Sequence, residues 1–105
     1  MPPKRLDALR ALLEQDPNNL LARYGLAMEF SNSGDFESAL AEFRRLIEIN
    51  PGYAAAYFHG GQALERLGRL EDAAGLYRRG IDAATRSGDL HLRNELQTAL
   101  DALGI

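Results

Sequence analysis

The chain has 105 residues, a length that favours one domain around a single hydrophobic core. Its 12 basic and 15 acidic residues leave a net charge of −3, so we expect no nucleic-acid partner, which would require a basic face. The absence of cysteine excludes disulfides, thiolate metal sites and cysteine nucleophiles.

The apolar residues are distributed without a targeting or membrane signal. The first 16 residues lack the continuous apolar stretch of a signal peptide, and no run approaches the 18 apolar residues of a transmembrane helix. We therefore expect a cytoplasmic protein without a membrane partner. Alanine and leucine dominate the apolar set and valine is absent, a composition that favours helices over strands.

The first predicted helix covers residues 4–15. Its leucines recur at the spacing of one helical face, at Leu6, Leu9, Leu12 and Leu13. The sequence DPNN at 16–19 ends this helix, and Asn18 or Asn19 can cap a second helix that runs to about Asn32.

Glycine and proline mark the remaining helix boundaries. Gly34 supplies a left-handed residue that ends the second helix, and Asp35 caps the third, which the sequence NPG at 50–52 breaks. Gly68 ends a fourth helix. The last three helices are expected at about 53–67, 69–86 and 89–103.

The short linkers determine how these helices pack. Linkers of two to four residues place consecutive helices in antiparallel hairpins. No segment alternates apolar and polar residues for long enough to predict a strand, and no linker is rich enough in serine or proline to separate domains. The sequence therefore predicts one all-α domain.

A repeat runs through the middle of the chain. GDFESA at 34–39 aligns with GRLEDA at 68–73, an offset of 34 residues. The same offset pairs FRR at 43–45 with YRR at 77–79. A 34-residue period built from two helices is the signature of one class of helical solenoid.

At these residues the chain resembles the tetratricopeptide repeat (TPR) family. Small residues stand where helices of that family touch closely, at Ala27, Ala39, Gly61 and Ala73. The resemblance implies an all-α, right-handed TPR-type solenoid of antiparallel helix hairpins with about six helices. It divides a single TPR domain over 1–105 into a half-repeat helix at 4–15, repeats at 20–53 and 54–87, and a capping helix at 89–103.

Some residues depart from the family pattern. Arg23 stands where the family has a large aromatic or leucine, so we expect the helix from residue 20 to pack loosely. Gly60 and Gly61 together weaken a helix interior by about 1 kcal/mol each. Thr85 replaces the proline that would close the second repeat, so the fifth helix can run further than the third.

The residues that could support chemistry are scattered. His59 and His91 lie on different helices without a set of convergent ligands, so we expect no metal site and no cofactor. No serine or threonine has the context of a nucleophile, and we expect no catalytic residues and no enzyme activity. The arginine pairs at 44–45 and 78–79 are interpreted as a solvated face, offset by Glu42, Glu48 and Asp82.

The resemblance implies instead a protein-interaction module that binds a peptide or helix in a concave groove. The groove-facing positions it implies are Leu21, Tyr24, Met28, Asn32, Ala55, Phe58, His59, Gln62 and Arg66. The alternative that Leu21, Tyr24 and Phe58 belong to the core stays open. Family members that clamp acidic chaperone tails use lysine and asparagine, where this chain has Tyr24, Met28 and His59, which weighs against that subtype.

Two functions therefore remain at the level of sequence. The first is an adaptor or scaffold that docks a protein or peptide partner through apolar anchors. The second is a structural unit that self-associates, as a possible homodimer, through its groove or a terminal helix, because two full repeats make a thin solenoid.

Overall fold

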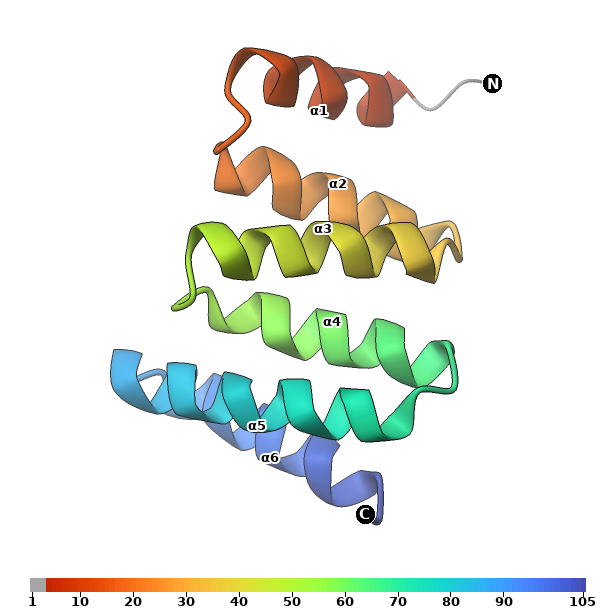
Figure 1. The fold of residues 1–105 in the computed structure, drawn as a ribbon. Helices are drawn as coiled ribbons and strands as arrows, with labels where there is room; N and C mark the ends of the chain where they lie inside the picture. The colour runs from red at the N-terminus through yellow and green to blue at the C-terminus, as the bar shows by residue number, and fades with distance from the viewer. Residues whose placement is uncertain (1–3) are drawn as a thin grey trace.

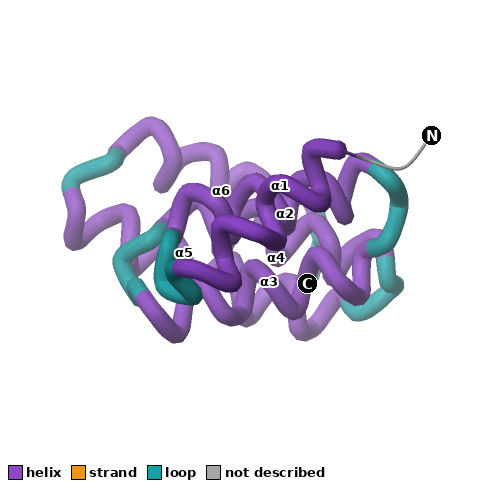
Figure 2. Tube along the Cα trace, turned by 90° about the horizontal axis from the view of Figure 1, so that it is seen from above, coloured by secondary structure: helices purple, strands orange, loops and turns teal. Residues whose placement is uncertain are grey.

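The computed structural model describes residues 4–105, and within that range it consists of six α-helices joined by short turns (Figures 1 and 2). The predicted helices are confirmed, with ends that differ by at most about two residues, the usual scatter of helix boundaries. Their bounds are α1 Lys4–Gln15, α2 Leu20–Asn32, α3 Phe36–Ile49, α4 Ala54–Arg66, α5 Leu70–Ser87 and α6 Leu90–Ala102.

The helices stack one after another, so that each packs on its neighbours in the sequence (Figure 1). The stack measures 40 × 28 × 19 Å, and its first and last helices lie at opposite ends. Helix α6 packs mainly on α5 and also touches α4. Consecutive helices run antiparallel, as the short linkers predict.

Three of the turns share one hydrogen-bonded geometry. Gly34, Gly68 and Gly88 all have positive φ angles, between 76° and 84°, at the ends of α2, α4 and α5. After each glycine, the next backbone N–H donates to the carbonyl five residues earlier, as from Asp35 to Phe30 at 2.9 Å. This arrangement satisfies carbonyls that the helix end leaves free.

Side chains cap the starts of three helices. The Asn19 side chain accepts from the N–H of Ala22 at 3.0 Å, which settles the choice between Asn18 and Asn19. Asp35 caps α3 in the same way, as predicted, and Asp89 caps α6. Each cap satisfies a donor that the first turn would otherwise leave unpaired.

Glycines in helix interiors let large side chains fill the core. A Cβ placed on Gly61 would lie 2.2 Å from the Tyr77 ring, and one on Gly80 would lie 2.6 Å from Cβ of Tyr57. Tyr77 has no exposed surface. The weak helix propensity of these glycines is therefore offset by close packing between α4 and α5.

Arg23 does not leave α2 loosely held, contrary to the expectation from the family pattern. Its guanidinium donates to Glu42 at 2.6 Å and to the carbonyl of Pro17 at 2.7 Å, and only 14% of its side chain is exposed. The ion pair ties α2 to α3 where an apolar contact was missing. Because Glu42 pairs with Arg23, it does not offset the charges of the arginine pairs at 44–45 and 78–79, contrary to the expectation from the sequence.

The two ends of the stack differ. Helix α1 has no buried residue and packs mainly on α2. At the other end, Leu96 of α6 is fully buried above Gly80, with Leu92 and Leu100 beside it at the core. Helix α5 has 18 residues against 14 in α3, which confirms the longer fifth helix.

Candidate peptide-binding groove

The nine residues of the expected groove all lie on α2 and α4. Leu21 is 78% exposed, which excludes it from the core. Tyr24 and Phe58 are half-buried and pack against the core with part of their surface, so each can face both core and groove. The other half-buried members are Met28, Ala55 and His59, and the other exposed ones are Asn32, Gln62 and Arg66.

A central hollow of about 380 Å³ brings five of the nine residues together. It lies between α2 and α4 and is lined by Met28, Asn32, His59, Gln62 and Arg66, with Ser31, Phe36, Ala63 and Glu65. The guanidinium carbon of Arg66 lies 4.8 Å from the centroid of the Phe36 ring, a cation–π distance. This contact holds Arg66 at the edge of the hollow.

Aromatic rings meet at the middle of the groove around His59. The His59 ring lies 5.8 Å from that of Tyr24, 5.3 Å from that of Phe58 and 5.9 Å from that of Phe43, measured between centroids. Its Nδ1–H donates to Oε1 of Gln62 at 3.3 Å. Burial lowers the pKa of His59, against the smaller effect of that hydrogen bond, so the imidazole is neutral at neutral pH.

A second hollow, of about 480 Å³, lies between α1 and α2. Its apolar lining includes Leu21, Tyr24 and Met28 of the expected groove, joined by Leu9 and Leu12 of α1. Leu12 is 47% exposed. Sequence reasoning missed these two leucines because it assigned the α1 stripe to packing.

A third hollow, of about 420 Å³, joins Phe58 to α6, and its α6 lining is His91, Asn94, Glu95, Thr98, Ala99 and Ala102. Nε2 of His91 lies 2.7 Å from Oε1 of Glu95. The sequence predicts α6 as a capping helix, with a terminal helix as one route to self-association, but it does not predict that α6 extends the groove. The sequence did contain a signal for this surface. Helix α6 follows a complete repeat, so it occupies the position that the first, groove-lining helix of a further repeat would have. Ala55 lines none of the three hollows.

The charges near the groove are largely engaged. Nε of Arg5 lies 2.5 Å from Oε1 of Glu29, and Arg66 stacks on Phe36. Within residues 4–105, no three histidine or acidic side chains gather where they could hold a metal ion. Over the same range, no helix is long and apolar enough to cross a membrane. The surface is therefore suited to apolar and uncharged polar contacts.

Helix pairs that repeat every 34 residues and stack along one axis, with a row of hollows over α2, α4 and α6, define a helical-repeat protein. Residues 24–88 match the tetratricopeptide repeat family. The chain therefore belongs to the TPR family, as the sequence resemblance had indicated. Proteins of this family are typically interaction modules and are generally not catalysts.

Individual relatives extend the likeness over most of the chain. A TPR repeat-containing protein of Pseudomonas aeruginosa is 29% identical over 98 residues, which are 93% of each chain. A TPR domain protein from Salinibacter ruber has the same fold, with a TM-score of 0.78 and 38% identity over 84% of this chain and 89% of that one. The first TPR of Spaghetti, solved bound to the HSP90 peptide SRMEEVD, shares the fold with a TM-score of 0.75 and 24% identity over 95% and 80% of the two chains.

Proposed function

We propose that this chain is a non-catalytic adaptor that docks an apolar peptide or helix of a protein partner along α2, α4 and α6. In this proposal, the repeats are 20–53 and 54–87, flanked by the helices at 4–15 and 89–103. The observation that carries it is the row of three hollows: Met28 lines the first two, and Phe58, whose ring lies 5.3 Å from that of His59 in the central hollow, lines the third.

The apolar side chains along this line support docking rather than solvation. Leu12 and Leu21 are large, exposed and lie in one hollow. A contiguous exposed apolar patch of this kind is typical of an interaction site. Tyr24, Met28 and Phe58 add a polarisable and aromatic surface that can accept anchors from a partner, as binding hot spots do.

Uncharged polar groups would orient the docked segment. Asn32 and Gln62 are exposed beside the central hollow, and their amides can donate to and accept from a partner's backbone. At the α6 end the Thr98 hydroxyl can act in the same way, whereas the Glu95 carboxylate can only accept. An extended or helical segment with apolar anchors two or three turns apart fits this arrangement of apolar hollows and polar edges.

The chemistry of the groove disfavours an acidic peptide such as the one bound to the first TPR of Spaghetti, with which this chain shares the fold alone. Clamping several carboxylates requires free cations. In the expected groove the single arginine, Arg66, stacks on Phe36, and the neighbouring Arg5 pairs with Glu29. We therefore expect a partner segment with few charges.

A capture experiment tests this assignment. Wild type, Leu21→Ala/Phe58→Ala and Leu70→Ala would be compared as baits in a native lysate, and the affinity of each recovered partner would then be measured with purified proteins. Leu70 is an exposed leucine on α5 that lines none of the hollows, so it controls for loss of one apolar side chain. The groove variant should bind at least about tenfold more weakly, since hot-spot truncations typically cost more than 1 kcal/mol each. Equal binding by the three folded proteins would refute the site.

Self-association is the second candidate, and one observation favours it. Helix α1 has no buried residue, yet it presents Leu12 beside Leu21 at one end of the stack. A second copy could cover this patch as an isologous dimer. Light scattering at two concentrations, with wild type and Leu12→Gln, separates the candidates: a stable dimer that the substitution dissociates would favour the structural unit over the adaptor.

A further inference from the structure

The arginine pairs repeated at 44–45 and 78–79 have no part in the proposed groove, and the structure shows that their charges are only partly offset. Glu48 pairs with Arg45 at 3.1 Å, and Glu42 is taken by Arg23. Within residues 4–105, Arg44, Arg79 and Arg86 have no carboxylate within 4.0 Å. These three arginines lie on α3 and α5, where, over the same range, Arg78 is also without a carboxylate partner but lines no hollow.

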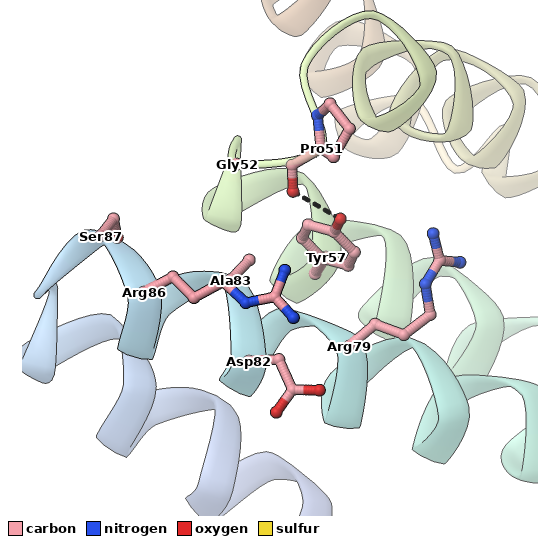
Figure 3. Close-up of a pocket in the computed structure, with 8 residues that line it drawn as sticks. All are labelled: Pro51, Gly52, Tyr57, Arg79, Asp82, Ala83, Arg86 and Ser87. Carbon is pink, nitrogen blue, oxygen red and sulfur yellow. Dashed lines mark hydrogen bonds between the residues drawn. The ribbon is translucent and has the colours of Figure 1, made fainter.

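Two of these arginines line a hollow of about 480 Å³ that shares no residue with the groove. Figure 3 shows the side chains of Arg79 and Arg86 on either side of the Tyr57 ring, rising from two points on α5, with the turn Pro51–Gly52 above them. The guanidinium carbon of Arg79 lies 5.5 Å from the Tyr57 ring centroid.

The opposite wall of this hollow is held in place by a buried tyrosine. The Tyr57 hydroxyl donates to the carbonyl of Pro51 at 2.6 Å, and little of Tyr57 is exposed. Asp82 also lines the hollow, but its carboxylate points away from Pro51 and Tyr57 (Figure 3). Among the charged side chains that line the hollow, Arg79 and Arg86 are therefore the ones that lie beside Tyr57.

The third arginine adjoins the same turn from the other side. Arg44, Arg79 and Pro51 line a neighbouring hollow of about 440 Å³, together with Ile47 and Glu48. The carboxylate of Glu48 is engaged by Arg45. Arg44, Arg79 and Arg86 thus surround one turn from two helices.

The length of α5 is what brings Arg86 to this turn. Helix α5 continues through Thr85, where its repeat frame would place a helix-ending proline, and its 18 residues end at Ser87. Had it ended at the length of α3, 14 residues, its last residue would be Ala83 and Arg86 would lie outside the helix. The site therefore arises from a departure from the repeat pattern.

We propose that Arg79 and Arg86, assisted by Arg44, form a binding site for a phosphate-type oxyanion, either free or carried by a partner as a phosphate monoester. A guanidinium presents paired N–H donors that match phosphate oxygens, and a tetrahedral dianion can accept from more than one arginine at once. The stacking of Arg79 on Tyr57 reduces the side-chain freedom lost on binding.

A titration followed by NMR tests the site with defined probes. Sodium phosphate is added to the full chain at constant ionic strength, with sodium chloride and sodium acetate as reference salts, while arginine Nε–H and backbone signals are recorded. Acetyl-glycyl-phosphoseryl-glycine amide serves as the peptide-borne arm. The variants are Arg86→Gln and the matched control Arg78→Gln, which removes the same charge from an exposed residue of α5 that lines neither hollow.

Phosphate should shift the Arg79 and Arg86 Nε–H signals saturably, and Arg86→Gln should weaken binding about tenfold or more, as expected for a charge-assisted contact. Arg78→Gln should weaken it less than about twofold, because a solvent-exposed charge outside the site is screened. Tighter binding of the phosphopeptide than of phosphate would identify a partner-borne group, and equal binding a free ion. The proposal would be overturned if Arg86→Gln and Arg78→Gln weakened phosphate binding equally, or if acetate shifted the same NMR signals as much as phosphate does.

Discussion

Placing a methyl group on Gly61 should destabilise the protein even though alanine is the better helix former. A Cβ at this position would lie 2.2 Å from Cε1 of Tyr77, 2.6 Å from Cδ1 and 2.7 Å from Cζ. Carbon atoms prefer separations of about 3.5–4.0 Å, so the ring would have to move by about 1 Å. Tyr77 has no exposed surface and its hydroxyl donates to Glu65, which leaves the ring no free direction.

The magnitude follows from two opposing effects. Replacing glycine by alanine inside a helix gains about 1 kcal/mol where space is open. Overpacking a filled core costs about 1–3 kcal/mol, and contact with three ring atoms places Gly61→Ala at the upper end. The free energy of unfolding should therefore fall by about 2 kcal/mol, which corresponds to a drop in Tm of roughly 10 °C.

Gly75 provides the matched control, because a Cβ there would have no heavy atom within 4 Å. Gly75→Ala on α5 should raise the free energy of unfolding by about 1 kcal/mol, opposite in sign to Gly61→Ala. Urea denaturation followed by circular dichroism measures both. If the new methyl group clashes with the Tyr77 ring, Gly61→Ala should cost at least about 1 kcal/mol less unfolding free energy in a Tyr77→Leu background than in the wild-type background. Gly61→Ala as stable as wild type would refute this account of the helix contact.

Two further predictions concern polar groups. Burial, with the nearby Glu65, raises the pKa of Tyr77 above its ordinary 10.0, so the unfolded chain releases this proton first and stability should fall as pH rises above about 10. Tyr77→Phe should reduce the difference between the free energies of unfolding that urea denaturation gives at about pH 9 and about pH 11. An unchanged difference would mean that another group causes the fall in stability. Arg23→Ala should lower the free energy of unfolding by about 1–3 kcal/mol by leaving Glu42 half-buried and unpaired, and a loss below about 0.5 kcal/mol would contradict this.

The helices could be predicted because their boundaries depend on local chemistry. A glycine that takes positive φ and a polar residue that caps the next turn act within a few residues, so Gly34 and Asp35 are legible without tertiary contacts. The 34-residue period then predicts which helices pair. Small residues at fixed places, such as Ala39 and Gly61, add the contacts between them.

The features that could not be predicted depend on contacts between helices at particular rotamers. Arg23 and Glu42 are 19 residues apart in the sequence. The repeat period does not indicate that the two side chains form an ion pair with each other instead of each facing solvent. The same holds for the groove. Periodicity places Leu12 and Leu21 on apolar faces, but it does not tell which of those faces a neighbouring helix covers, and in the structure both leucines are exposed.

In the proposed function, helix α6 would combine a sealing role with a binding role, because the two would use different stripes of its surface. Leu96 is buried over Gly80 of α5, while Asn94, Glu95 and Thr98 remain exposed and continue the hollow that begins at Phe58. A terminal helix that packs mainly on one neighbour belongs to the least stable part of a fold. A partner that spans Phe58 and α6 would therefore contact both that helix and the repeat before it, and its binding energy would stabilise this end of the stack.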